Sequence, residues 1–240
     1  MDIMPYVNAL LDSYEQVENY TRKGFGVHGR LLIAVSETIL IQVLQPVFAE
    51  FYRRAPDVHL VLRVLNSFKI RDEVIHENLD FAVMYDIGSF SASVITHPLM
   101  AQEMILVGGP DISADEMDFV TPNQQKPFAL IVRDNYNVYG HRLDDYLHER
   151  NISLRTRWEL GSNEAVRQCV MYGIGVAFLP KAAVAEELKQ GCLLEIPTEL
   201  ESREAMAILA YNKNRWISPA MKIFTEILFA RMIPGLEISF

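Results

Sequence analysis

The stretch GSNEAVRQCVMYGIGVAFLP, at residues 161–180, is the part of the sequence that decides the fold class. It opens with the helix-start triplet Gly161-Ser162-Asn163, continues as a short apolar helix and breaks at Gly173. The apolar run that follows predicts a buried strand ending at Leu179-Pro180. No catalytic group stands out in these residues. The triplet instead offers backbone N–H groups and small polar side chains, which suit an anion at a helix N-terminus.

Strands and helices alternate in the same way along the rest of the chain. Apolar runs predict strands at 31–36, 59–66, 80–86, 128–133, 155–160, 175–180, 192–197 and 204–211, and two more within 93–109. Helices are predicted between them at 38–56, 70–79, 142–150, 163–172, 181–191 and 218–232. Strands that alternate with helices over short connections indicate a parallel sheet built from βαβ units.

The strands and helices fall into two blocks, at 30–92 and 105–200, followed by a final strand and helix. The stretches that join the blocks, around 95–105 and 200–206, are both strand-like. Two extended connections between two α/β blocks predict a hinged pair of lobes with a cleft between them. A further amphipathic helix is predicted at 5–22, and it either docks on its own domain or packs on a second copy.

The composition limits the classes of protein that this chain can belong to. It has 240 residues, of which 50% are hydrophobic and 22% charged, as in a globular protein with a large core. Its 22 Lys and Arg residues face 31 Asp and Glu residues, so the net charge is −9. A protein that grips nucleic-acid phosphates carries a basic face, so this chain is by itself a poor nucleic-acid binder. No apolar run reaches the roughly 20 residues of a membrane helix. The N-terminus also lacks a secretory pattern, so we expect a cytoplasmic protein with no membrane partner.

Patterns for metal binding and catalysis are missing from the sequence. The six histidines and the two cysteines, Cys169 and Cys192, show no metal-ligand spacing, and no nucleophile-elbow or phosphate-loop motif occurs. The acidic pairs Asp144-Asp145 and Glu186-Glu187 fall within predicted helices and are interpreted as solvated faces. We therefore expect no metal, no cofactor and no catalytic residues. A two-lobe enzyme with dispersed catalytic residues stays open as an alternative.

Four stretches, taken in order, resemble a known bacterial family. They are GRLLIAV at 29–35, LQPVFAEFYRRAPDVHLVL at 44–62, LDFAVMYD at 79–86 and the stretch at 161–180. Their order and spacing are similar to those of the effector-binding region of LysR-type transcriptional regulators, and the resemblance covers 30–235. It implies an α/β fold of two Rossmann-like subdomains joined by two crossover strands, which is periplasmic-binding-protein-like (type II).

The resemblance also implies a division of the chain and a set of partners. Residues 1–27 are then the end of a linker and dimerisation helix. The first regulatory subdomain comprises 28–98 with 206–240, and the second comprises 105–200. The two hinge crossovers are 99–104 and 201–205. The implied partners are a small-molecule effector, with a carboxylate as one candidate, and further copies in a homodimer or homotetramer. DNA is expected to bind only through an N-terminal winged helix-turn-helix that is absent from these residues. The alternative is a stand-alone solute-binding protein, or a two-lobe enzyme, of the same fold.

Polar side chains at the carboxyl ends of the predicted strands are the candidate effector-binding residues, because ligands of such folds bind where these ends meet helix N-termini. They are Ser36, Glu37, Thr38, Asn66, Ser67, Tyr85, Asp86, Arg133, Tyr136, Gly161, Ser162 and Asn163, with Met100 on a crossover. Several have a second interpretation. Ser162 and Asn163 can be helix caps alone, as can Ser36 and Thr38. Arg133 can neutralise a ligand carboxylate, or it can pair with Asp134 or Glu37.

Overall fold

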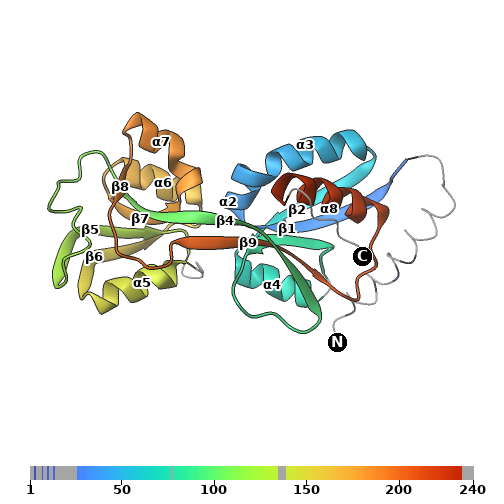
Figure 1. The fold of residues 1–240 in the computed structure, drawn as a ribbon, viewed down its shortest axis with the longest axis horizontal. Coiled ribbons are helices and arrows are strands. Elements are labelled where there is room, and N and C mark those ends of the chain that lie inside the picture. Colours follow the sequence, from blue (N-terminus) through green and yellow to red (C-terminus); the bar gives the residue numbers. More distant parts are fainter. Residues whose placement is uncertain are drawn as a thin grey trace. The chain divides into compact units, whose positions relative to one another are not determined.

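Two compact units make up the protein in the computed structural model, which describes residues 26–76, 78–134 and 139–233 together with 3, 7, 10 and 13. Unit 1 comprises Met1–Met100 and Met206–Phe240, and unit 2 comprises Ala101–Ala205. The predicted helix at 5–22 lies almost wholly outside the described residues, and Tyr136 lies outside them too. Figure 1 shows the elements of each unit with the labels used below.

In unit 1 the strands follow one another across the sheet in the order β2-β1-β3-β9. The strands are β1 (Gly29–Val35), β2 (Val58–Val64), β3 (Phe81–Tyr85) and β9 (Glu204–Asn212). β1 pairs in parallel with β2 and with β3, and β9 pairs antiparallel to β3. Every residue of β3 is buried, as expected of a strand covered on both faces. The carboxyl ends of the three parallel strands therefore meet at one edge of this sheet.

Helices cover both faces of the unit 1 sheet. Helix α3 (Gln45–Arg54) and helix α8 (Pro219–Met232) lie on one face, and helix α4 (Ser67–Ile75) lies on the other (Figure 1). The ring of Phe224 on α8 packs 6.1 Å from that of Phe48 and 5.9 Å from that of Phe51, both on α3. It also lies 5.8 Å from the ring of Phe81 on β3, so one aromatic cluster joins both helices to the sheet.

The predicted helix at 38–56 is not one regular α-helix. The chain forms a short α-turn, α2 (Glu37–Ile39), then a π-helical turn (Leu40–Leu44), and only then α3. Pro46 lies in the first turn of α3. Proline has no N–H to donate to the carbonyl four residues earlier, which leaves the turn before it free to widen. The prediction of a helix was right, and the prediction of a single uniform one was wrong.

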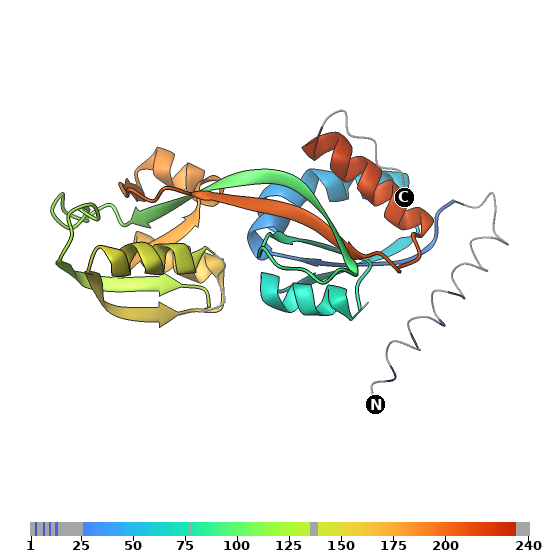
Figure 2. The same cartoon turned by 60° about the horizontal axis from the view of Figure 1, so that its bottom comes forward.

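Unit 2 is a second α/β layer structure. Its strands are β5 (Gln124–Val132), β6 (Ile152–Glu159), β7 (Gly175–Pro180) and β8 (Leu194–Ile196), together with the residues of β4 (Val94–Gly108) from Ala101 onward. β5 pairs in parallel with β6 and β7, whereas β4 pairs antiparallel with β7 and β8. Helix α5 (Gly140–Glu149) lies on one face of this sheet, and α6 (Asn163–Met171) and α7 (Ala185–Gln190) lie on the other (Figures 1 and 2).

The interior of unit 2 explains why the stretch at 161–180 is so regular. Val166 and Val170 on α6 are buried against Ala177 and Leu179 on β7 and against Ile131 on β5. These apolar positions are the ones that the sequence pattern assigns to a buried helix face and a buried strand. The predicted helix and strand of this stretch are therefore confirmed, with a turn at Gly173 between them.

Two further predictions of secondary structure need correction. The segment 93–109 is one continuous strand, β4, and not two. Pro98 lies within it, which a strand accepts wherever the missing N–H has no ladder partner to serve. The predicted helix at 181–191 is a 3-10 turn (Lys181–Val184) followed by α7. Val184, which is fully buried, leaves helical backbone geometry at φ −126° as its side chain enters the core.

The two glycines of the Gly173-Ile174-Gly175 turn meet different requirements. Gly173 has φ +71°, which side-chain-bearing residues rarely adopt, and the space around it is open. Gly175 lies opposite Ala129 in the β5·β7 ladder, where a Cβ atom would come within 2.0 Å of the Ala129 carbonyl oxygen. Gly173 is needed for the backbone conformation of the turn, and Gly175 allows β5 and β7 to approach each other.

Candidate functional site

Two buried serines mark the carboxyl ends of adjacent parallel strands in unit 1. Ser36 directly follows β1, and Ser67 begins α4 directly after the two residues that follow β2. Their hydroxyl oxygens lie 3.5 Å apart, and the two residues are 7% and 5% exposed. Ser36 precedes a helical turn without capping it by its side chain, so the alternative interpretation of Ser36 as a cap alone does not hold. Both hydroxyls are thus held inside the protein at the edge where ligands of α/β sheets bind.

Other predicted residues of unit 1 also lie at this edge but have local partners. The side chain of Asn66 accepts the N–H of Lys69 at 2.9 Å and so caps α4. Asp86, after β3, accepts the N–H of Gly88 at 2.8 Å and closes a turn. Glu37 and Thr38 are half-buried in the first helical turn after β1, and Tyr85 is buried as the last residue of β3. The edge therefore combines hydroxyl, amide and carboxylate groups.

Arg133 is the charged residue at the corresponding edge of unit 2. It follows β5, and its guanidinium contacts the carboxylate of Asp134 at 2.8 Å. The side chains are 18% and 26% exposed, so the pair is partly withdrawn from water. The backbone carbonyl of Arg133 accepts the N–H of Gly161 at 2.7 Å, which brings the end of β5 beside the start of α6. Pairing with Asp134, one of the two predicted roles of Arg133, is confirmed.

Ser162 and Asn163 form the N-terminus of α6. The Ser162 hydroxyl accepts the N–H of Ala165 at 3.5 Å, so this serine does cap the helix. Gly161 precedes it with φ +70°, a backbone conformation that glycine adopts without strain. Asn163 is the first residue of the helix and is half-buried. The triplet positions the helix N-terminus next to Arg133.

A small cavity, partly open to solvent, lies at this end of the unit 2 sheet. Arg133 and Asn163 belong to its lining. Residues that the sequence did not suggest line it as well: Leu130, Ile131, Val132, Gly140, Leu143, Asp144, Arg157, Val166, Phe178 and Leu179. The cavity thus has an apolar floor formed by the strands and a polar rim formed by arginine, asparagine and aspartate.

Asp144 and Arg157 form a charge pair in the wall of this cavity. The two guanidinium Nη atoms of Arg157 donate to the two carboxylate oxygens of Asp144 at 2.8 and 3.2 Å. The interpretation of Asp144 as part of a solvated helix face is therefore wrong, because the aspartate is half-buried and paired. No sequence signal reveals this pair, since the partners lie on different elements and meet only when α5 packs on β6.

The groups at these strand ends, in each unit taken by itself, are mostly polar. Hydroxyls, an amide, a guanidinium and a helix N-terminus supply hydrogen-bond donors, which suits an anionic or hydroxylated ligand. Met100, on β4, is half-buried and offers an apolar contact surface. Within 26–76, 78–134 and 139–233, no three His, Cys, Asp or Glu side chains are grouped to hold a metal ion. No helix among these residues is long and apolar enough to span a bilayer.

Solved structures share the fold of this protein. The regulatory domain of Synechocystis PCC6803 CcmR, in complex with 2-PG, superposes with a TM-score of 0.71 at 20% identity, covering 87% of this chain and 99% of that one. Full-length LysG of Corynebacterium glutamicum, with bound effector Arg, also gives 0.71 at 17% identity, covering 98% of this chain and 76% of that one. The fold is periplasmic-binding-protein-like, of type II, as predicted. It is the fold of ligand-binding regulatory domains.

Sequence similarity identifies the family. The pattern described as the LysR substrate binding domain matches residues 25–232. The uncharacterized HTH-type transcriptional regulator YfiE of Escherichia coli (strain K12) is 30% identical over 233 residues, which are 97% of this chain and 78% of that protein. The chain belongs to the LysR family of transcriptional regulators, in which it is the substrate-binding, effector-sensing domain. The predicted resemblance is confirmed.

Proposed function

We propose that this domain binds a small carboxylate effector at the carboxyl ends of its parallel strands. In unit 1 the proposed contacts are Ser36, Glu37, Thr38, Asn66, Ser67, Tyr85 and Asp86, in unit 2 they are Arg133, Tyr136, Gly161, Ser162 and Asn163, and Met100 lies on β4. The observation that carries the proposal is the buried hydroxyl pair of Ser36 and Ser67. Two hydroxyls 3.5 Å apart form at best a weak bond with each other, so both keep capacity for a ligand.

Arg133 supports a carboxylate as the ligand group. Its present partner, Asp134, is the neighbouring residue and is partly solvated, so a ligand carboxylate can replace it without leaving a buried charge unpaired. Solved proteins of this fold also bind small molecules: the CcmR regulatory domain is in complex with 2-PG, and full-length LysG has bound effector Arg. The effector acts through its different affinities for two arrangements of the regulator, and so shifts their populations. DNA is contacted by a separate N-terminal domain, and the regulator works in the cytoplasm.

Arg133→Ala is expected to weaken binding of a carboxylate effector by about tenfold or more, since a charge-assisted hydrogen bond is lost. Ser67→Ala is expected to weaken it by several-fold. A thermal-shift screen of small acids, amino acids and aromatic compounds first finds the ligand, and calorimetry then measures the dissociation constants. Arg155→Ala, which removes an exposed arginine on β6, is the matched control.

Unchanged affinity in both Arg133→Ala and Ser67→Ala would remove these residues from the site. Incubating the protein with the ligand and analysing the ligand afterwards distinguishes a binding protein from an enzyme. We propose a binding protein and not an enzyme, so the ligand should be recovered unchanged after long incubation. Its steady conversion to a product would favour an enzyme of the same fold.

The partner copies of a homo-oligomer are proposed to pack on exposed apolar side chains. Tyr52 on α3 and Tyr172 after α6 are 71% and 82% exposed, and Trp158 on β6 is 42% exposed. Large exposed aromatic side chains are typical centres of protein interfaces. The predicted helix at 5–22 is a second proposed contact.

Tyr172→Glu is expected to raise the dissociation constant of the oligomer about 30-fold, the effect of losing about 2 kcal/mol at an interface hot spot. Sedimentation velocity over a concentration series measures the shift towards monomer. Lys222→Glu, an exposed charge change on α8, should leave the oligomer intact. If deletion of residues 1–25 produces monomer and Tyr172→Glu does not, the oligomer depends on the predicted helix at 5–22. The proposed contact through Tyr172 is then wrong.

A further inference from the structure

The segment Pro197–Arg203, called the strap below, joins β8 to β9 and is neither helix nor strand. It carries the chain from unit 2 towards β9, whose later residues form the strand next to β3 in unit 1. Its position therefore decides how the chain enters β9. Side chains of α5 bind it at several points.

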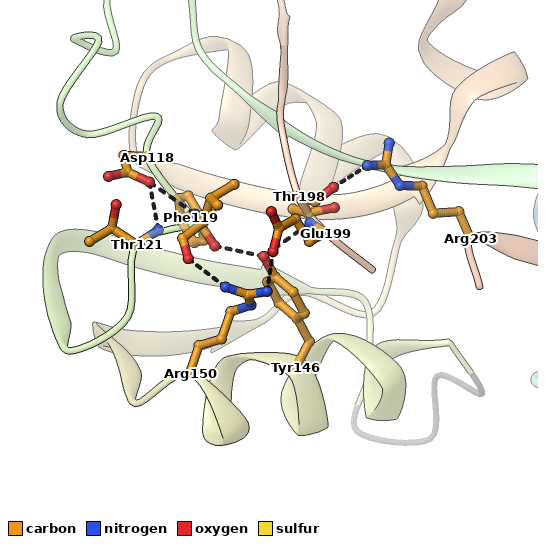
Figure 3. Close-up of polar contacts among 9 residues, drawn as sticks. Asp118, Phe119, Thr121, Tyr146, Arg150, Thr198, Glu199 and Arg203 are labelled. Carbon is orange, nitrogen blue, oxygen red and sulfur yellow. Dashed lines mark hydrogen bonds and ion pairs between the residues drawn. The ribbon is translucent and has the colours of Figure 1, made fainter. Parts of the chain in front are cut away.

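Three residues of α5, Arg142, Tyr146 and Arg150, form a stripe at four-residue spacing along the helix and its C-cap. Arg142 donates through one Nη atom to the Ser202 hydroxyl at 3.1 Å and to the Glu204 carbonyl at 3.0 Å. The Tyr146 hydroxyl accepts the N–H of Glu199 at 3.1 Å. Arg150 donates to the Glu199 carboxylate. Figure 3 shows Tyr146 and Arg150 directed from α5 towards Glu199.

The same stripe holds a second irregular segment in place. The Tyr146 hydroxyl donates to the Phe119 carbonyl at 2.8 Å, and Arg150 donates to the Val120 carbonyl at 2.6 Å. That turn is fixed from its other side by Asp118, whose carboxylate accepts two backbone N–H groups (Figure 3). The bond from Thr121, followed by that from Val120, lowers the pKa of Asp118 to about 2. The strap is thus bound to a helix that is itself anchored at its C-terminal end.

The N-terminal half of α5 lies at the cavity described above. Gly140, Leu143 and Asp144 belong to the cavity lining, and Asp144 pairs with Arg157 there. Leu143 is adjacent to Arg142, the first residue of the stripe. One helix of 10 residues therefore contacts the cavity and the strap at the same time. A helix moves largely as a rigid rod, because its backbone is hydrogen-bonded along its length.

We propose that α5 is a positioning element that couples the cavity at the end of β5 to the strap. A change at the cavity wall displaces α5, and the Arg142–Tyr146–Arg150 stripe transfers that displacement to the strap and to the start of β9. The coupling has a regulatory role only if an effector binds beside Arg133, so that part of the inference rests on the proposed function. Tyr146 and Arg150 act through the strap and do not touch the ligand.

Hydrogen exchange of the ligand-free protein tests the first half of the proposal. Tyr146→Phe removes only the hydroxyl, and the Glu199 amide should then exchange about tenfold faster, as expected for the loss of one hydrogen bond. Arg150→Ala should speed exchange across the strap, and Arg150→Lys, which keeps the charge, should restore part of the protection. If the strap exchanges as in the wild type in Tyr146→Phe and Arg150→Ala, the stripe does not hold it and the proposal fails.

The coupling itself is tested from the cavity side. Asp144→Asn breaks the pair with Arg157, and exchange of the strap amides should rise about threefold, within the range expected for a half-exposed ion pair. Glu164→Gln is the matched control, because it disturbs an ion pair with Arg167 on α6, which also borders the cavity. Equal strap exchange in the two variants would overturn the coupling. Since no ligand is present, that outcome is independent of whether Arg133 binds an effector.

Discussion

Replacing Gly175 with alanine is expected to destabilise unit 2 by about 3 kcal/mol, the upper part of the usual range for over-packing. The added Cβ atom would lie 2.0 Å from the carbonyl oxygen of Ala129, which is backbone of the neighbouring strand. A flexible side chain could move away from such a contact, but a strand paired on both sides cannot. β5 pairs with β6 and with β7, so its displacement also disturbs the end of β5 that carries Arg133.

Gly173→Ala provides the comparison, two residues earlier in the same turn. A Cβ atom at Gly173 meets no neighbour within 4 Å, so only the left-handed backbone conformation is penalised. The expected loss is about 1 kcal/mol. Urea denaturation of both variants, followed by circular dichroism, measures the two free energies of unfolding. Equal losses would mean that close packing of β5 and β7 is not the reason for the second glycine.

Asp80→Ala is expected to lower the free energy of unfolding of unit 1 by about 3–5 kcal/mol, the cost of breaking a buried ion pair from one side. Asp80 precedes β3, and its side chain is 10% exposed. One carboxylate oxygen accepts two guanidinium bonds from Arg215 at 2.6 and 3.0 Å, and the other accepts the backbone N–H of Leu32 at 2.7 Å. Alanine leaves the charge of Arg215 and the amide of Leu32 inside the protein without this acceptor.

An ion pair on the surface provides the control that shows whether burial of Asp80 causes the expected loss of unfolding free energy. Arg54 and Glu226 are 2.6 Å apart, but their side chains are 42% and 61% exposed. Glu226→Ala should therefore cost less than about 1 kcal/mol. The double variant Asp80→Ala with Arg215→Met should be more stable than Asp80→Ala alone, because the buried guanidinium that lost its contact with Asp80 is removed as well. A loss in Asp80→Ala no greater than that in Glu226→Ala would contradict the expectation.

Most of the strands could be predicted because each is an apolar run bounded by turn residues. β3, buried along its whole length, is the clearest case. The wrong predictions of secondary structure lie near prolines, which occur both inside and at the ends of helices and strands. The segment 93–109 was predicted as two strands and is one, with Pro98 inside it, and Pro46 lies in the first turn of α3 after a π-helical turn that no periodicity shows. Backbone geometry around proline depends on partners that the local sequence does not contain.

Part of the candidate site could be predicted from the sequence, because some of its residues lie at the ends of predicted strands and helices. The ion pairs in the site could not be predicted. Arg133 and Asn163 were predicted from their places at a strand end and a helix start, and both line the cavity. Asp144 and Arg157 were missed because their contact requires α5 to lie on β6. Capping by Ser162 was foreseen as an alternative and is present, so the same hydroxyl that suggests a ligand already has a structural partner.

Unit 2 is one uninterrupted segment, Ala101–Ala205, whereas unit 1 takes its residues from both sides of that segment. A ribosome working from the N-terminus therefore synthesises unit 2 before most of β9 and all of α8. Until β9 arrives, the edge of β3 that Ala210 and Leu209 will cover has no strand beside it. During translation this open edge can pair with a strand of another chain, which is how unpaired strand edges lead to aggregation.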